Sequence, residues 1–232
     1  MKENISTVSG QRIRNAQMAV FRQMYVWMTL ALAITGITAL IISNDGELMY
    51  KISSDPTIVW IAVIAELALV ITLASRIHKM SLGTATIVFI IYSILNGVTM
   101  SLLFLAYAEA TITSTFFVTA GTFAAVSLYG YVTKSDLSSW GSIFMMALIG
   151  IIIASIVNIF MESSTLYWII TYAGVLIFVG LTAYDTQKIK HAIFASDASE
   201  TAYKIALMGA LELYLDFINL FIYLLRIFGN RD

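Results

Sequence analysis

Residues 209–225 read GALELYLDFINLFIYLL, an apolar run long enough to cross a bilayer that also contains two carboxylates, Glu212 and Asp216. A spanning helix needs about 20 apolar residues to cross a hydrocarbon core of roughly 30 Å. The two acids are four residues apart, so they share one face of a helix about one turn from each other. Because a charge at the bilayer centre costs roughly 2.5–3.5 kcal/mol on insertion scales, this pair indicates a proton- or cation-handling site.

The composition is that of an integral membrane protein. Of the 232 residues, 59% are hydrophobic and 12% are charged, whereas soluble domains carry about 25% charged residues. Long apolar runs favour helices over a β-barrel. A net charge of −1 gives no case for binding nucleic acid, and the chain has no cysteine for thiolate–metal or disulfide chemistry.

Seven apolar segments are predicted to span the membrane. They cover residues 24–43, 57–75, 82–107, 112–132, 140–160, 166–185 and 205–226. We expect one seven-helix domain over residues 24–226, with a cytoplasmic tail at residues 1–23 and a short tail at residues 227–232. The connections are predicted to be short, except residues 44–56, which hold the only proline, and residues 186–204, which form a polar hinge.

Basic residues predict the orientation. The N-terminal tail and the second, fourth and sixth loops are basic, whereas the first, third and fifth loops together hold one basic residue, Lys51. Since basic loops stay on the cytoplasmic side, the N-terminus should be cytoplasmic. An odd number of spans then places the C-terminus outside, in conflict with Arg226 and Arg231, and we favour a full last span over a re-entrant one.

A polar stripe follows the last predicted span. Its members are Gly209, Glu212, Asp216, Asn219 and Tyr223, and their alternating spacing of three and four residues places them on one helix face. On a helix that is otherwise apolar all round, such a stripe should face a cavity or partner groups rather than lipid. The alternative is a packing stripe of hydrogen bonds in which the acids stay protonated.

Asp185 closes the sixth predicted span. If that helix packs beside the last one, Asp185 and Asp216 come together, and two carboxylates in a poorly hydrated site would share one proton. With Glu212 and Asn219 they offer only oxygen ligands, which suit Ca²⁺ better than a soft transition metal. We therefore predict transient calcium contacts at Asp185, Asp216 and Glu212. The alternative for Asp185 is an interfacial ion pair with Lys188.

The second predicted span adds two candidates. Glu66, at its middle, either lines the same pathway or is protonated and bonded to a threonine or a backbone carbonyl. Arg76, at its end, either snorkels to the interface or reaches the acids at the cytoplasmic mouth. His78 and His191 are expected in loops, neither with a second histidine at ligand spacing. The chain contains no HExxH, GxSxG or glycine-rich phosphate loop, so we expect neither an enzyme nor a bound cofactor.

Two stretches carry a family resemblance: LTAYDTQK at residues 181–188, and LYLDFINLF at residues 213–221, which runs on to LRIFG at residues 225–229. Along essentially its whole length the chain resembles the transmembrane Bax-inhibitor-motif (Bax inhibitor/YccA-like) family, and it looks like the bacterial branch. The resemblance implies an all-α fold in which six helices sandwich a central seventh. It also implies a multi-pass protein of the bacterial cytoplasmic (inner) membrane.

The same resemblance implies a pH-sensitive calcium leak, in which an aspartate pair from the last two helices senses protons. By position, that pair falls on Asp185 and Asp216. Arg76 is the nearest match to an arginine that bonds the pair in some members. Calcium and protons would be the ions handled. Other members regulate a membrane protease, so the alternative function is a membrane-embedded regulator that binds and restrains such a protease. A proton-coupled carrier is a third possibility.

Overall fold

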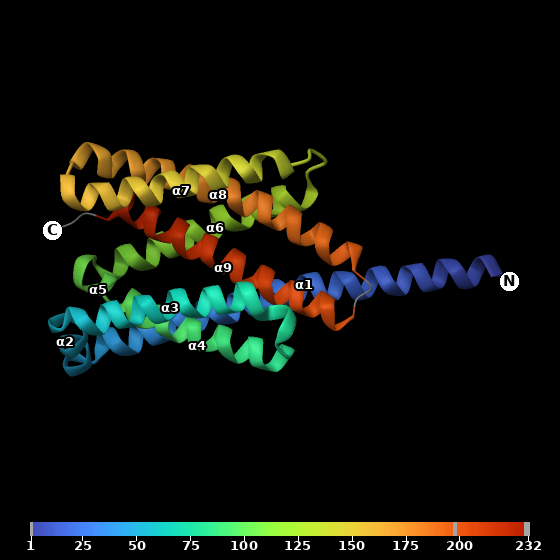
Figure 1. The fold of residues 1–232 in the computed structure, drawn as a ribbon, viewed down its shortest axis with the longest axis horizontal. Coiled ribbons are helices and arrows are strands. Elements are labelled where there is room, and N and C mark those ends of the chain that lie inside the picture. The colour runs from blue at the N-terminus through green and yellow to red at the C-terminus, as the bar shows by residue number, and fades with distance from the viewer. Residues whose placement is uncertain (1, 197–198, 230–232) are drawn as a thin grey trace. The chain divides into compact units, whose positions relative to one another are not determined.

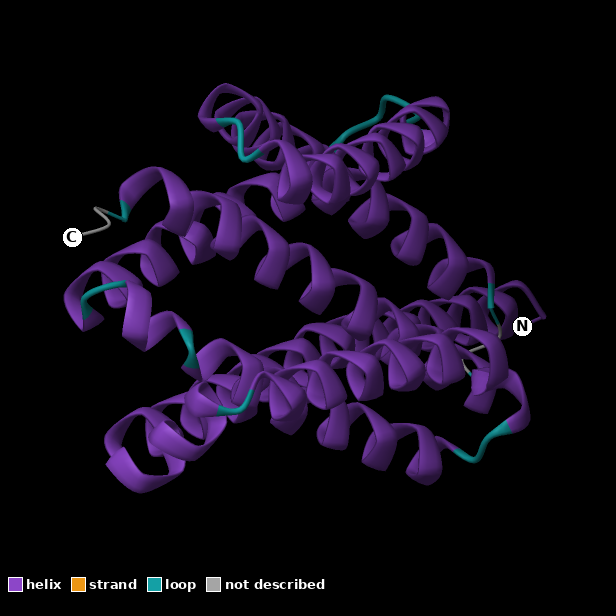
Figure 2. Ribbon diagram, turned by 60° about the vertical axis from the view of Figure 1, so that its left-hand side comes forward, coloured by secondary structure: helices purple, strands orange, loops and turns teal. Residues whose placement is uncertain are grey.

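The computed structural model describes residues 2–196 and 199–229, and within these residues every regular element is a helix (Figure 2). The elements are, in chain order, α1 (Lys2–Asn44), α2 (Gly46–Ser54), α3 (Pro56–Arg76), η1 (Ile77–Lys79), α4 (Leu82–Ser101), α5 (Leu103–Ala106), α6 (Glu109–Val132), α7 (Ser138–Met161), α8 (Ser164–Ala195) and α9 (Glu200–Phe228). Among these described residues, 7 helical segments are long and apolar enough to cross a membrane. The predicted all-α membrane protein with seven spans is confirmed.

The predicted hinge at residues 186–204 is wrong in its extent, because α8 continues to Ala195 and α9 begins at Glu200. Hydropathy marks the part of a helix that suits lipid, but backbone hydrogen bonding continues until a residue interrupts it, and no glycine or proline lies between residues 186 and 195. His191 therefore lies on a helix rather than in a loop. For the same reason most of the predicted N-terminal tail is helical, since α1 begins at Lys2.

Two aspartates explain why the connection around residues 44–56 contains a short helix. The side chain of Asp45 accepts hydrogen bonds from the backbone N–H groups of Glu47 and Leu48, which caps α2. The side chain of Asp55 accepts one from Thr57 N–H and caps α3, where Pro56 occupies the first turn. These caps satisfy N–H groups that helix starts leave unpaired.

The chain divides into two compact units. Unit 1 contains residues Met1–Ala106 and Ile189–Tyr214, and unit 2 contains residues Tyr107–Lys188 and Leu215–Asp232. The two long helices α8 and α9 therefore each contribute to both units. Among the described spans, α9 has the largest share of buried residues.

In unit 1, α4 packs along both α1 and α3 (Figure 1). The close approach of α1 and α4 depends on Gly97, where a Cβ atom would lie 2.5 Å from Cβ of Thr38. Small residues at helix contacts let backbones approach within a membrane, where packing rather than hydrophobic transfer holds helices together.

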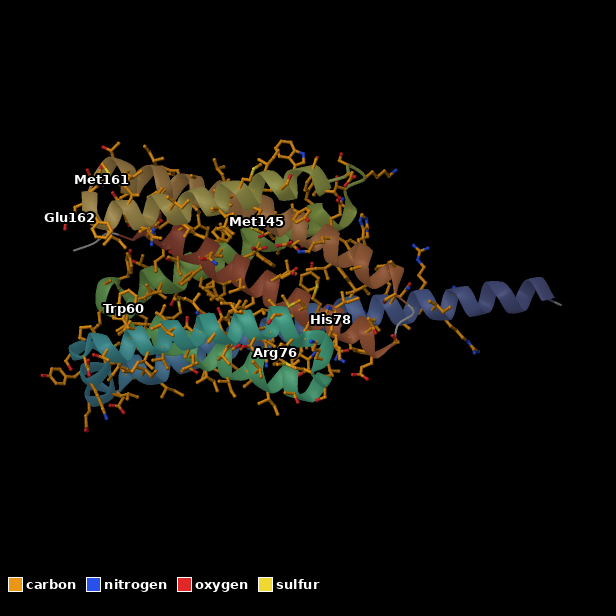
Figure 3. The ribbon with its side chains drawn as sticks, viewed as in Figure 1. Trp60, Arg76, His78, Met145, Met161 and Glu162 are labelled. Atoms are coloured by element: carbon orange, nitrogen blue, oxygen red, sulfur yellow. The ribbon has the colours of Figure 1, made fainter. Side chains whose placement is uncertain are left out.

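In unit 2, α7, α8 and α9 share an apolar core. Its buried members are Ile151, Ile170, Ile177, Phe178, Leu181, Leu220 and Leu224. Gly130 of α6 lies directly against the backbone of Ala183 on α8, where there is no room for a side chain. The outer face of α7 is exposed and apolar, as Met145 and Met161 illustrate (Figure 3), and this is the surface that a spanning helix presents to lipid.

Candidate functional site: the aspartates of the last two spans

The structure places Asp185 on α8 and Asp216 on α9, and both belong to unit 2. Both residues are nearly buried, with exposed fractions of 8% for Asp185 and 5% for Asp216. Charged residues are almost never buried in this way unless they are paired or protonated. The two acids that the sequence singled out are thus interior residues of the same unit.

The helices α8 and α9 pack side by side in unit 2, which was the condition for the two aspartates to meet. The rings of Phe178 and Tyr223 stack with centroids 5.8 Å apart, and Leu181 and Leu220 share the apolar core. Asp185 follows Phe178 by seven residues, and Asp216 precedes Tyr223 by seven. Seven residues make about two turns of a helix. Asp185 therefore lies on the same face of α8 as Phe178, and Asp216 lies on the same face of α9 as Tyr223, each roughly 10 Å along the helix axis. In an antiparallel register this spacing would bring the two carboxylates to the same level.

Asp185 also has a cationic partner. The Nζ atom of Lys188, three residues along, donates to Oδ1 of Asp185 at 2.7 Å, and the same ammonium lies 5.5 Å from the ring centre of Tyr184. The ion pair that the sequence suggested as an alternative is therefore present, and the aspartate in it is also nearly buried.

Neighbouring polar residues hold this end of α8 in place. The hydroxyls of Ser127 on α6 and Thr186 on α8 are 2.9 Å apart. The side chain of Gln187 accepts from Leu137 N–H at 2.9 Å and donates to Ser135 O at 2.8 Å. These bonds fasten α8 to α6 and to the α6–α7 connection beside Asp185. Sequence reasoning gave Gln187 no role of its own, and its signal was its place in the LTAYDTQK stretch, two residues after the aspartate.

The polar stripe predicted on α9 is not uniform. Asp216 is buried, whereas Glu212, Asn219 and Tyr223 are partly exposed. Asn219 donates through Nδ2 to the carbonyl of Leu215 on its own helix, at 2.8 Å. Glu212 belongs to unit 1, and Asp216 and Asn219 belong to unit 2.

Glu66 and Arg76 lie on α3 in unit 1. Glu66 is half-buried and accepts hydrogen bonds from Thr99 and Asn96 on α4, which matches the predicted bond to a threonine. Arg76, in the last turn of α3, is exposed beside His78 of η1 (Figure 3).

Within the described part of the chain, no group of three or more His, Cys, Asp or Glu side chains is arranged to hold a metal ion. The candidate site is therefore not a closed calcium cage of the kind in which six to eight oxygens surround the ion. Contacts of Asp185, Asp216 and Glu212 with a passing cation stay a prediction.

Comparison with known proteins identifies the family. The sequence profile of the family described as "Inhibitor of apoptosis-promoting Bax1" matches residues 17–232. An Escherichia coli relative, "Inner membrane protein YbhL", is 50% identical over 211 residues, which are 90% of this chain and 90% of the relative. An uncharacterized protein of Rickettsia prowazekii is 43% identical over 209 residues, 90% of this chain and 88% of that one. The chain therefore belongs to the family of inhibitors of apoptosis-promoting Bax1.

Proposed function

We propose that this protein is a pH-sensitive calcium leak channel of the bacterial cytoplasmic membrane, gated by protonation of Asp185 and Asp216. The observation that carries the proposal is the placement of two nearly buried aspartates on adjacent helices of one unit, at matching distances from a stacked aromatic pair. An apolar setting penalises two neighbouring negative charges more heavily than water does.

The lysine partner assigns different roles to the two acids. Lys188, 2.7 Å from Asp185, stabilises negative charge on that carboxylate. A proton shared by the two acids would then reside mainly on Asp216, which would donate to ionised Asp185. When that proton leaves, two carboxylates face each other in a site of low polarity, and their repulsion loosens the contact between α8 and α9.

The path for the cation would follow the acidic side of α9. Glu212 lies about one turn before Asp216, and Asn219 lies about one turn after it. Carboxylate and amide oxygens suit a hard cation such as Ca²⁺. Few fixed ligands favour passage over retention, because conduction requires binding that is weak enough for the ion to leave.

The spans and the relative support the proposed location. The E. coli relative carries the name of an inner membrane protein, and 7 helices of this chain are long and apolar enough to cross a bilayer in the part that the structure describes. The basic N-terminal tail and even-numbered loops support an orientation with the N-terminus in the cytoplasm.

The test is calcium flux into liposomes that contain a calcium dye, measured over a series of pH values. Wild-type flux should change with pH, and Asp216→Asn should remove most of that dependence, because asparagine cannot release a proton. Glu109→Gln, at an exposed acid in the first turn of α6, is the matched control and should keep the wild-type profile. An Asp216→Asn profile identical to wild type would overturn the gating role.

The alternative, a regulator that binds and restrains a membrane protease, draws on the N-terminal helix. Residues 10–16 are exposed on α1 and include Arg12 and Arg14, so this segment of the helix offers a basic surface to a partner. Deletion of residues 2–14 should then abolish capture of the protease and leave calcium flux unchanged. Flux that is absent from purified wild-type protein, with capture that depends on this segment, would favour the regulator.

A further inference from the structure

A network of hydrogen-bonded polar side chains links helices within unit 1, and it starts at Glu66. Thr99 Oγ1 is 2.9 Å from Oε1 of Glu66, and the side-chain amide of Asn96 is 3.4 Å from Oε2. Both partners lie on α4, whereas Glu66 lies on α3. The carboxyl group is therefore in contact at both of its oxygens.

The network continues from Asn96 through two buried hydroxyls. The other side of the Asn96 amide is 3.0 Å from the hydroxyl of Tyr214 on α9. That hydroxyl is 2.6 Å from Oγ1 of Thr35 on α1, which donates to the carbonyl of Ser93 at 2.9 Å. Tyr214 is 0% exposed and Thr35 is 4% exposed, so these contacts are shielded from bulk solvent.

If Glu66 is ionised, this network has one hydrogen too few to place one in every contact. If the Asn96 amide turns its oxygen to Tyr214, the single hydrogen of Tyr214 points to Asn96. The single hydrogen of Thr35 then has to serve both the carbonyl of Ser93 at 2.9 Å and the hydroxyl of Tyr214 at 2.6 Å. One of these two buried contacts is left without a hydrogen of its own.

If the Asn96 amide is turned over, every contact of Tyr214 and Thr35 has a hydrogen, and the contact between Asn96 and Glu66 lacks one instead. The oxygen and nitrogen of an amide have the same shape, so the hydrogen-bond network decides which faces which partner. With its nitrogen toward Tyr214, Asn96 donates to Tyr214, Tyr214 donates to Thr35, and Thr35 donates to Ser93. The amide oxygen now faces Oε2 of Glu66, and this contact holds a hydrogen only if the carboxyl group is protonated.

We propose that Glu66 is a second proton-binding site in the membrane, independent of the aspartate pair, where a neutral carboxylic acid donates to Asn96. With one proton on the Glu66 carboxyl group, each contact between helices in the network has its own hydrogen. Release of the proton would force the Asn96 amide to turn, and the one hydrogen of Thr35 would then be divided between Ser93 and Tyr214. Because Tyr214 lies on α9 two residues before Asp216, the loss would weaken the hold of α1 and α4 on this helix.

The surroundings of Glu66 agree with a neutral acid. Between residues 60 and 74 the exposed residues of α3 are apolar, among them Trp60, Ile64 and Leu67, so Glu66 lies on a part of the helix that faces lipid. A charge there would cost roughly 2.5–3.5 kcal/mol on insertion scales. Two titratable phenols face Glu66, those of Tyr92 on α4 and Tyr214 on α9, and α1 contributes the neutral hydroxyl of Thr35.

Infrared spectroscopy of the purified protein in D₂O tests the proposal directly. A protonated carboxylic acid has a C=O stretching band that a carboxylate lacks. The spectrum at neutral pH should contain a band that Glu66→Gln removes and that Asp216→Asn leaves in place. Tyr214→Phe removes one hydroxyl of the network and should shift the band. Tyr92→Phe, whose ring also packs against Tyr214 with centroids 5.7 Å apart, should not.

Thermal unfolding gives a second readout. Glutamine keeps a donor for Asn96 and an acceptor for Thr99, so Glu66→Gln should unfold near the wild-type temperature. In the unfolded chain the glutamate releases its proton at about pH 4.3. Wild type should therefore lose the stability that a protonated Glu66 contributes as the pH rises above that value. Glu66→Gln has no proton to release there and should not show this loss. A folded wild-type protein with no acid band assignable to Glu66 at neutral pH would overturn the proposal. It would leave the calcium-flux test of the aspartates unaffected.

Discussion

Phe178 on α8 and Tyr223 on α9 stack with ring centroids 5.8 Å apart and an angle of 27° between the ring planes. This contact sets the register of the two helices in unit 2, and Asp185 and Asp216 lie seven residues from it along their respective helices. From this relationship we expect the two acids, which are thirty-one positions apart in sequence, to lie at the same level of the unit. The candidate gate therefore depends on apolar packing two helical turns away.

Overpacking this aromatic contact should disturb the pH response without touching either acid. A Cβ atom at Gly174 would lie 2.5 Å from the ring of Tyr223, so Gly174→Val should displace the ring and cost about 1–3 kcal/mol. We expect a lower unfolding temperature and a weaker dependence of calcium flux on pH. Gly150→Val is the matched control, because nothing lies within 4 Å of a Cβ atom there. Equal effects of the two variants would count against the register argument.

Removal of the cation beside Asp185 should move the pH response. Lys188→Gln removes an ammonium 2.7 Å from the carboxylate, and without it the aspartate pair should hold its proton more firmly. The midpoint of calcium flux against pH should therefore shift to higher pH. Lys134→Gln, which removes a charge from the exposed α6–α7 connection, should leave the midpoint unchanged. A shift to lower pH after Lys188→Gln would contradict the assignment of the proton to Asp216.

The bonds of Gln187 should contribute to stability. Gln187→Ala leaves Leu137 N–H and Ser135 O without their side-chain partner, and each lost bond should cost about 1–3 kcal/mol where the group stays away from water. Gln187→Glu keeps the acceptor for Leu137 and loses the donor for Ser135, so its effect should be smaller. Thermal unfolding in detergent measures both variants. An alanine variant as stable as wild type would show that the α6–α7 connection does not depend on this residue.

If the N-terminus is cytoplasmic, as we propose, seven full spans would place the C-terminus outside, although Arg226 lies in the last turn of α9. Its guanidinium lies 5.1 Å from the ring centre of Tyr223 and 5.6 Å from that of Tyr167. Such cation–π contacts hold the charge at the end of the helix and offset the preference of basic residues for the cytoplasm. Since the chain has no cysteine, a cysteine inserted after Gly229 should be labelled by an impermeant thiol reagent in intact cells. Lys51→Cys should also be labelled, and Lys134→Cys should not.

Hydropathy alone predicted the seven spans, because the length of an apolar run has to match the thickness of the bilayer wherever the helix later packs. It misplaced the C-terminal end of α8, since helical hydrogen bonds continue through polar residues such as Gln187 until the chain itself stops them. Asp216 and Glu66 also stood out in the sequence, because each is a carboxyl group within an apolar run. A carboxyl group in such a run is costly in any fold.

Only the tertiary structure decided which partner each of these acids has. Sequence spacing relates residues on one helix, whereas the contacts of Glu66 with Asn96 and of Asn96 with Tyr214 join separate helices. The burial of Asp185 beside Lys188 and the level of Asp216 relative to it likewise follow from how α8 and α9 pack. The physical reason is that the composition determines the cost of placing an acid in the membrane, while the packing of distant helices determines which hydrogen bonds and charges offset that cost.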